Sequence, residues 1–285
     1  MQRCGGIQKG LSLIILLSFG LVGCQQPPWP INDTALQSKN YNSRVRLIVI
    51  HYTSGNFASS AAALTGKNSA SVSSHYLIPA KMDTSFRAKK YEVFQLVPDA
   101  MRAWHAGFSY WQGMTSLNDN SIGIEITNRS RCENIGKQDE VCSELAYQSE
   151  QIEALINLLQ QLEERHGQID PTRYVGHSDI ATARKRDPGS LFPWHQLYEA
   201  GFGAWPDALT VARYQAEFHN ELPPLMVLQS QLNTYGYEID PTGLDDQQSR
   251  NAVTAFQQHF MPTSVDGTFD SETAAILFAL NDKYR

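Results

Sequence analysis

The first part of the chain carries the apolar pattern of a sheet with flanking helices. Residues 45–52 are almost continuously apolar and β-branched, which predicts a central strand covered on both faces. Further strands are predicted at 75–78, 92–97, 121–127 and 173–176. A long amphipathic helix is predicted at 150–166 and a shorter one at 58–64. This alternation indicates an α/β fold, a mixed sheet flanked by helices, over 44–205.

The pattern changes after residue 205. We expect a linker over 206–222 and a small all-α domain over 223–285. Three short helices are predicted there, at 223–235, 246–259 and 270–280, because apolar residues recur at i, i+3 and i+4. Glycines at 236, 243 and 267 mark the turns between them.

The N-terminus has the pattern of an export signal. Arg3 and Lys9 precede an apolar run that ends at Gly23-Cys24, and the run is too short to span a bilayer as a mature helix. Leu21-Val22-Gly23-Cys24 resembles a bacterial lipobox, which implies a signal peptide over 1–23, acylation of Cys24 and a tether over 24–43. The residue after the cysteine is Gln25 and not Asp, which in a Gram-negative host implies sorting to the outer membrane, facing the periplasm. The alternative is an ordinary signal peptide with a chance cysteine.

Composition and charge narrow the class of protein. The chain has 285 residues, of which 42% are hydrophobic and 18% charged, enough for one medium and one small domain. The formal charge is −6, and it becomes −8 when removal of residues 1–23 takes away Arg3 and Lys9 and no acid. No basic block stands out, so nucleic acid is excluded as the main partner.

The cysteines fit an exported protein. Apart from Cys4 and Cys24 in the signal region, the chain has only Cys132 and Cys142, ten residues apart in one polar loop. An oxidising compartment favours a disulfide between them. Two free thiols, or half of a metal site, are the alternatives, whereas a four-cysteine zinc site is excluded because no second pair exists.

Three residues could form a metal site. His51 lies at the carboxyl end of the first predicted strand and His177 at the end of another, where functional side chains gather in such sheets. Asp187 follows in Arg186-Asp187-Pro188-Gly189. Two imidazoles, a carboxylate and one open position make a catalytic zinc centre. Taken singly, each histidine could be structural, and the aspartate could simply hold a turn.

Six ordered motifs carry a family resemblance. They are Ile50-His51-Tyr52-Thr53, Ser74-His75-Tyr76-Leu77-Ile78, Ala103-Trp104-His105-Ala106-Gly107, Ser121-Ile122-Gly123-Ile124-Glu125, Val175-Gly176-His177-Ser178-Asp179-Ile180 and Arg186-Asp187-Pro188-Gly189. Together they resemble the type-2 amidases, zinc-dependent N-acetylmuramoyl-L-alanine amidases that share a fold with peptidoglycan recognition proteins. With the lipobox and the helical module, the AmiD-like branch of envelope lipoproteins is the most similar.

The resemblance implies roles for individual residues. It implies one Zn²⁺ held by His51, His177 and Asp187, with Glu125 as the catalytic carboxylate and Lys185 beside the developing oxyanion. Without it, Glu125 would be read as a solvent-facing strand residue and Lys185 as part of a solvated basic loop.

Other histidines and aromatic residues are less specific. Trp104 and His105 are expected to line the cleft and bind substrate, although His105 could equally be a loop histidine. His75 is not assigned as a ligand. Trp194 and Tyr198 are expected in the core and not as a platform for sugar.

The C-terminal helices resemble the peptidoglycan-binding-like three-helix domain, on the segments 228–232, 252–257 and 265–270. The alternative is a helical cap that binds nothing. The whole pattern predicts hydrolysis of the amide between the lactyl group of N-acetylmuramic acid, possibly also its anhydro form, and L-alanine of the stem peptide. Peptidoglycan or muropeptides and the membrane are the partners it implies, with no protein partner. The competing functions are a non-catalytic peptidoglycan-binding lipoprotein and a structural tie to the wall.

Overall fold

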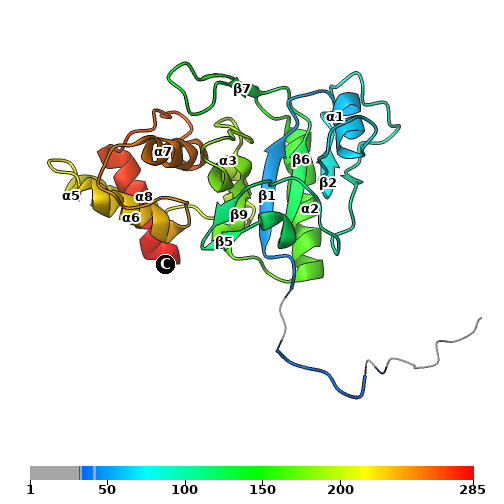
Figure 1. The fold of residues 1–285 in the computed structure, drawn as a ribbon, viewed down its shortest axis with the longest axis horizontal. Coiled ribbons are helices and arrows are strands. Elements are labelled where there is room, and N and C mark those ends of the chain that lie inside the picture. The colour runs from blue at the N-terminus through cyan, green and yellow to red at the C-terminus, as the bar shows by residue number, and fades with distance from the viewer. Residues whose placement is uncertain (1–31, 33, 41–42) are drawn as a thin grey trace, which may run out of the picture. The chain divides into compact units, whose positions relative to one another are not determined.

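The computed structural model describes residues 32, 34–40 and 43–285 (Figure 1). The predicted signal peptide, Cys24 and most of the predicted tether lie outside the described residues. Residues 43–285 form one compact unit that holds all the helices and strands given below. Of the helices in the described ranges, none combines the length and the apolar character needed to cross a membrane.

A five-stranded sheet in the order β3-β2-β6-β1-β9 forms the centre of the first domain. Its strands are β1 (Leu47–Tyr52), β2 (Tyr76–Ile78), β3 (Phe94–Gln95), β6 (Ser121–Ile126) and β9 (Tyr174–Gly176). β3 runs antiparallel to β2, and the other pairings are parallel, which confirms the predicted mixed sheet. β1 lies between β6 and β9 with both faces buried, as its continuous apolar sequence predicts.

Short elements surround the sheet. The helices are α1 (Phe57–Leu64), α2 (Ser149–His166), α3 (His177–Ile180) and α4 (Trp194–Glu199), with 3₁₀ turns η1 (Leu117–Asp119) and η2 (Pro171–Arg173). Two hairpins add β4 (Tyr110–Trp111) with β5 (Met114–Thr115), and β7 (Arg131–Glu133) with β8 (Val141–Ser143). α2 begins at a capping box between Gln148 and Gln151 and ends before Gly167, whose φ is +85°.

The last part of the chain is helical: α5 (Ala208–Glu217), α6 (Leu225–Tyr235), α7 (Gln247–Phe260) and α8 (Ser271–Tyr284). The three predicted helices are confirmed as α6, α7 and α8. α5 was not predicted, and it occupies the segment 206–222 that the sequence assigns to a linker. None of the residues of α5 is fully buried, so its apolar pattern is weak. Val211 and Tyr214 are partly buried and pack against Ala274 and Ala275 of α8.

The two faces of the sheet face different cores. Ile48 and Ile50 of β1 pack with Leu155 and Leu159 of α2. Leu47 and Val49 point to the opposite face, because side chains alternate along a strand, and join a core that includes Leu232, Tyr235 and Phe256 of the C-terminal helices. The helical domain therefore shares a hydrophobic core with the sheet.

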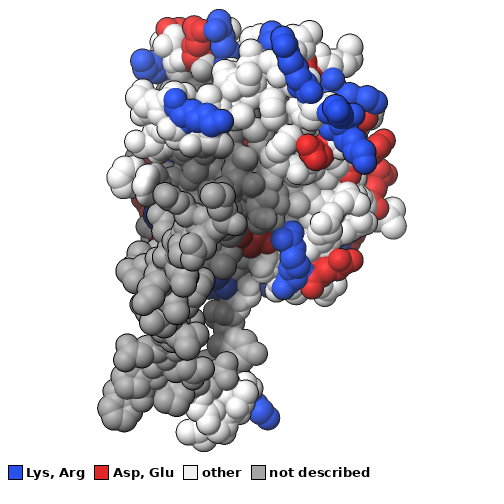
Figure 2. All heavy atoms as spheres, turned by 90° about the vertical axis from the view of Figure 1, so that its right-hand side faces the viewer, with Lys and Arg blue, Asp and Glu red and all other residues white. Residues whose placement is uncertain are grey.

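Outside the grey atoms, the face drawn in Figure 2 has basic side chains along its upper and right edges, with acidic side chains next to them. This distribution agrees with the net negative charge of the chain.

Candidate active site and metal centre

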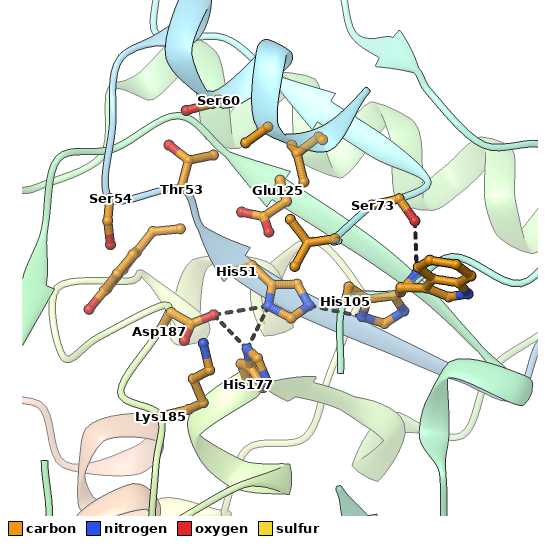
Figure 3. A pocket seen from close by; sticks show the side chains of 15 residues that line it. His51, Thr53, Ser54, Ser60, Ser73, His105, Glu125, His177, Lys185 and Asp187 are labelled. Carbon is orange, nitrogen blue, oxygen red and sulfur yellow. Dashed lines mark hydrogen bonds and ion pairs between the residues drawn. The ribbon is translucent and has the colours of Figure 1, made fainter. Parts of the chain in front are cut away.

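His51, His177 and Asp187 converge at one end of the sheet (Figure 3). His51 Nδ1 lies 3.0 Å from His177 Nδ1 and 2.9 Å from Asp187 Oδ2. His177 Nδ1 lies 3.1 Å from the same carboxylate oxygen, and all three side chains are buried. In the sequence, His51 is 126 positions from His177 and 136 positions from Asp187, yet the three side chains present their donor atoms to one point.

The topology explains this meeting. His51 lies near the carboxyl end of β1, and His177 begins α3 directly after β9, the parallel neighbour of β1. Carboxyl ends of adjacent parallel strands share one edge of a sheet, which is where side chains collect into sites. The loop after α3 brings Asp187 back to this edge, where its carbonyl accepts a hydrogen bond from the Ser178 N–H at 2.8 Å.

The three donors suit zinc. Two imidazole nitrogens and one carboxylate oxygen are a ligand set of catalytic zinc sites, which keep a fourth position for substrate or water. The second ring nitrogen of His177 lies 3.1 Å from the Ala106 carbonyl, the type of outer contact that orients a metal-ligating imidazole. Among the described residues, the only other group with metal-ligand spacing is Cys132, Glu140 and Cys142, and its sulfurs are joined in a disulfide.

Glu125 lies beside this cluster. It is the register partner of His51 on the neighbouring strand β6, so both side chains leave the same face of the sheet. Its Oε2 is buried without a hydrogen-bond partner in the described part of the chain. Burial, and next the charge of Asp187, raise the pKa of Glu125 well above the usual carboxyl range, while Lys185 opposes this shift. The solvent-facing alternative for Glu125 therefore does not describe this side chain.

A cleft of about 250 Å³ opens above these groups. It is lined by the three donor side chains, by Glu125 and Lys185, and by Trp104 and His105. Lys185 extends toward the Asp187 carboxylate in Figure 3, and Trp104 is 54% exposed, so its indole is available to a ligand. His105 is buried, and both of its ring nitrogens have partners in the protein.

Comparison with known proteins agrees with this geometry. The family model described as N-acetylmuramoyl-L-alanine amidase matches residues 41–190, which is more than half of the chain. The chain belongs to the N-acetylmuramoyl-L-alanine amidase family. A second model, described as "Putative peptidoglycan binding domain", matches residues 222–277 of this amidase.

Relatives cover nearly the whole amidase. It is 44% identical over 254 residues to the N-acetylmuramoyl-L-alanine amidase AmiD of Escherichia coli, covering 88% of each chain. The crystal structure of AmpDh3 from Pseudomonas aeruginosa superposes with a TM-score of 0.82 at 44% identity, over 90% of this chain and 99% of that one. A complex of E. coli AmiD superposes with a TM-score of 0.76 at 42% identity, over 89% and 95% of the two chains.

The ionisation of the ligand groups in the amidase favours metal binding. Burial, and next the imidazole of His177, lower the pKa of His51 to about 4, which keeps the ring neutral and its lone pair free near neutral pH. Burial alone would raise the pKa of Asp187, but the two imidazoles beside it lower that pKa far below the usual range. His51 thus offers a neutral nitrogen and Asp187 an anionic oxygen, the forms in which these groups bind zinc.

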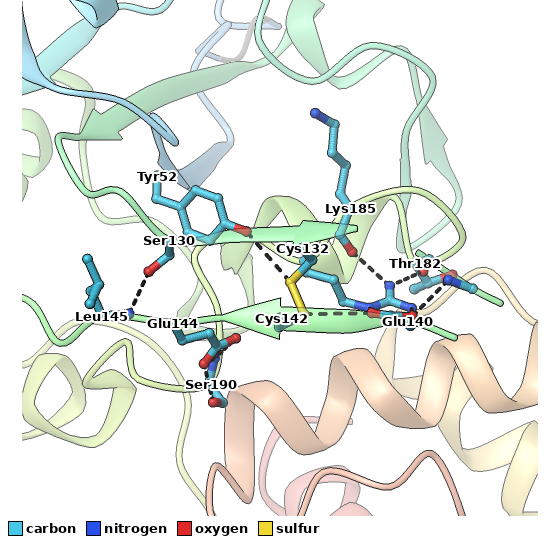
Figure 4. Close-up of a disulfide and its surroundings, with 12 residues drawn as sticks. Tyr52, Ser130, Cys132, Glu140, Cys142, Glu144, Leu145, Thr182, Lys185 and Ser190 are labelled. Carbon is cyan, nitrogen blue, oxygen red and sulfur yellow. Dashed lines mark hydrogen bonds and ion pairs between the residues drawn. A yellow bond between two sulfur atoms is a disulfide. The ribbon is translucent and has the colours of Figure 1, made fainter. Parts of the chain in front are cut away.

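The disulfide hairpin holds the loop that carries Lys185 and Asp187 (Figure 4). Cys132 of β7 and Cys142 of β8 are register partners joined by a disulfide, with Cα atoms 4.0 Å apart. Next to the bridge, both carboxylate oxygens of Glu140 accept from the buried guanidinium of Arg186, at 2.6 and 2.9 Å. Planar fork-to-fork contacts of this kind hold orientation as well as distance.

Sequence reasoning missed several residues that support the site. Arg186 belongs to the Arg186-Asp187-Pro188-Gly189 motif, but the motif does not predict its contact with Glu140. Glu140 carries no sequence signal, because its role depends on where the hairpin docks. Asp179, two residues after His177, accepts from the Tyr237 hydroxyl at 2.7 Å and lies 2.8 Å from His259 Nδ1 of the helical domain. The expectation that Trp194 belongs to the core is confirmed, since it is buried and stacks on His259 at 3.8 Å between ring centroids, whereas Tyr198 is only partly buried.

Proposed function

We propose that this amidase uses zinc held by His51, His177 and Asp187 to hydrolyse the amide between the lactyl group of N-acetylmuramic acid and L-alanine of the stem peptide. The observation that carries the proposal is the convergence of three buried donor atoms within 3.1 Å of one another, with Glu125 on the neighbouring strand at the same register. Zinc, when bound there, supplies Lewis acidity toward water and toward the scissile carbonyl.

Glu125 is the proton carrier in this proposal. Its side chain lines the cleft, and its Oε2 has no hydrogen-bond partner among the described residues, so Glu125 is placed to take a proton from the attacking water and to pass one to the leaving amine. A raised pKa suits both halves of that task, because a carboxylate that holds a proton more tightly is a stronger base and keeps the proton until the amine leaves.

Lys185 stabilises charge in this proposal. Its side chain lines the same cleft. The proposed role of its ammonium is to stabilise the oxygen that becomes negative as water adds to the carbonyl. A fixed positive charge in a partly buried site stabilises such an oxyanion more strongly than water does. The hairpin contact of Arg186 holds the backbone on which Lys185 stands, since the Arg186 guanidinium also donates to the Lys185 carbonyl at 2.9 Å.

The solved complexes indicate the form of the substrate. AmpDh3 has been crystallised with an anhydromuramic pentapeptide, and E. coli AmiD with anhydro-N-acetylmuramic acid-L-Ala-D-γ-Glu-L-Lys. At 44% and 42% identity to these chains, this amidase is proposed to accept anhydromuramyl peptides as well as muramyl ones, with the exposed Trp104 on the cleft wall contacting the ligand.

Location is proposed from the sequence. The lipobox at Cys24 supports a lipid anchor in the outer membrane with the catalytic domain in the periplasm. The expected test is Cys24→Ser, which releases the protein to the soluble periplasmic fraction with undiminished activity on isolated wall. Continued membrane fractionation of that variant would contradict the anchor.

One experiment separates the proposed function from its competitors. Purified chain is analysed for bound zinc and incubated with isolated sacculi, and the soluble products are identified by mass spectrometry. We expect one zinc per chain, free stem peptides that begin with L-alanine, and loss of both in His177→Ala. Binding to sacculi with no release would indicate a recognition lipoprotein. Neither zinc nor release would leave a structural role.

A further inference from the structure

A row of buried imidazoles extends behind the proposed zinc ligands. The ring of His105 packs edge-on against His51, with centroids 5.1 Å apart, and against His75 at 5.7 Å. His51 is proposed to bind zinc, whereas the other two rings stand outside that ligand set. Their hydrogen bonds determine where each ring carries its proton.

The hydrogen bonds of Ser121 determine which nitrogen of His105 carries the proton. Its Oγ lies 2.6 Å from the Leu117 carbonyl, and a carbonyl only accepts, so the hydroxyl hydrogen lies on that contact. The 3.2 Å contact between Ser121 Oγ and His105 Nε2 is therefore an N–H donated by the ring. A neutral imidazole carries one N–H, which leaves His105 Nδ1 as an acceptor.

The acceptor on His105 decides the tautomer of His51. His51 Nε2 lies 3.0 Å from His105 Nδ1, so His51 donates its single N–H there. Its Nδ1 then keeps a lone pair, and this is the atom that faces His177 and Asp187. Without such a partner, the N–H could sit on Nδ1 and donate to the Asp187 carboxylate, which would block the metal position.

Ala106, the residue after His105, orients His177, the second proposed imidazole ligand. The Ala106 carbonyl lies 3.1 Å from His177 Nε2, which directs the His177 N–H away from the cluster. Asn118 holds the segment in place, because its Oδ1 accepts from the backbone N–H groups of His105 and Ala106 at 3.0 and 2.8 Å. Two consecutive residues therefore fix the proton positions of both histidines in the cluster.

Gly123 leaves the space that this arrangement needs. A Cβ added to Gly123 would overlap the His105 ring, closer than any real contact. The Gly123 N–H also donates to His75 Nδ1 at 3.0 Å. A glycine in the middle of a central strand costs stability, so its presence here fits a ring that must lie flush against the strand.

We propose that His105 is a positioning residue that, with Ser121 behind it, fixes His51 in the tautomer whose Nδ1 faces the metal. The inference rests on the zinc site of the proposed function and adds to it a residue that acts through His51. It replaces the expectation that His105 binds substrate, because the ring has no free nitrogen to offer.

Matched variants test the proposal through zinc affinity. His105→Phe keeps a ring but offers no acceptor, whereas His105→Asn places an amide oxygen near the position of Nδ1. We expect His105→Phe to raise the zinc dissociation constant by about 10- to 100-fold, the usual range for outer-shell partners of a ligand. His105→Asn should recover most of that loss, and Ser121→Ala should fall between. His195→Phe, at an exposed position of α4, is the control and should match wild type. Chelator competition on the full chain measures each constant, with circular dichroism to verify folding.

The tautomer gives a readout that is independent of zinc. Two-bond ¹H–¹⁵N correlation spectra of the metal-free wild-type protein should show His51 and His105 protonated at Nε2. Protonation of His51 at Nδ1 would overturn the inference, even if no variant folded. Equal zinc affinity in His105→Phe and wild type would also overturn it while leaving the proposed zinc site intact. Failure of the wild-type chain to bind zinc would instead count against the proposed function.

Discussion

His259 Nδ1 of α7 lies 2.8 Å from Asp179 Oδ2 of α3. This contact joins a helix of the C-terminal domain to a residue that follows the proposed ligand His177 by two positions. Both side chains are buried, and the other carboxylate oxygen of Asp179 accepts from Tyr237. The helical domain therefore supports the catalytic domain as well as matching a peptidoglycan-binding model.

The first prediction concerns this contact. His259→Ala should lower the free energy of unfolding by about 2–4 kcal/mol, because it removes a partner of a buried carboxylate and the stacking surface on Trp194. Urea denaturation of the full chain measures the change. His219→Ala, at an exposed position just after α5, should stay within about 0.5 kcal/mol of wild type. An equally small effect in His259→Ala would show that the contact does not hold the domains together.

The second prediction separates metal binding from catalysis. Glu125→Gln should keep zinc and the fold, since the amide is nearly isosteric, but should lose about 10²- to 10⁴-fold in activity, the scale for removing a general base. Zinc analysis and the rate of stem-peptide release measure the two effects. His51→Ala should lose zinc and activity together. Near wild-type release by Glu125→Gln would refute the proton-transfer role, and loss of zinc would make Glu125 a ligand or a support of one.

The third prediction concerns Lys185. Lys185→Ala should keep zinc and should lower kcat with little change in KM, because the charge that the ammonium stabilises exists only in the transition state. Kinetics on a soluble muropeptide separate the two parameters. Lys137→Ala, an exposed lysine of the disulfide hairpin, is the matched control. A rise in KM at constant kcat would instead assign Lys185 to substrate binding.

The fourth prediction concerns the disulfide in the exported protein. Cys132→Ser should lower the free energy of unfolding by about 2–3 kcal/mol, the stabilisation expected for closing a short loop. Cys132→Ser and the double variant with Cys142→Ser should behave alike, because each lacks the same bond. Mass spectrometry of the non-reduced protein provides the direct measurement, and two free thiols in exported material would rule the bond out.

The fifth prediction is a pH dependence of stability. Burial lowers the pKa of His75 to about 4, and the charge of Arg44 contributes in the same direction, although the hydrogen bond to the Met101 carbonyl opposes the shift. Below the unfolded pKa of about 6.5, the unfolded chain binds a proton that the folded chain does not. The contribution of His75 is therefore full above that pH and is lost as the pH falls toward 4, at up to about 1.4 kcal/mol per pH unit.

Denaturation of the metal-free protein between pH 4 and pH 7 tests this linkage. His75→Asn keeps an acceptor for the Gly123 N–H, and it should flatten the curve by the slope of one proton. An unchanged slope in His75→Asn would mean that His75 titrates alike in the folded and unfolded states.

Much of the fold and the ligand set could be predicted from the sequence. The continuous apolar run 45–52 indicated a strand buried on both faces, and β1 has that position because side chains alternate between two cores. The six motifs pointed to His51, His177 and Asp187, since a family resemblance carries positions that are far apart in the chain. The export signal and Cys24 rest on the sequence alone, because they lie outside the described residues.

The tertiary structure decided what the sequence could not. The helix α5 was missed because it buries no residue completely, and burial is what makes an apolar pattern visible. The roles of His105, Arg186 and His259 depend on partners 16 to 80 residues away, whose side chains meet only after folding. For His105, the sequence gives the residue but not its hydrogen-bond roles, because each imidazole nitrogen can either donate or accept. The contacts from Leu117 through Ser121 determine which nitrogen donates.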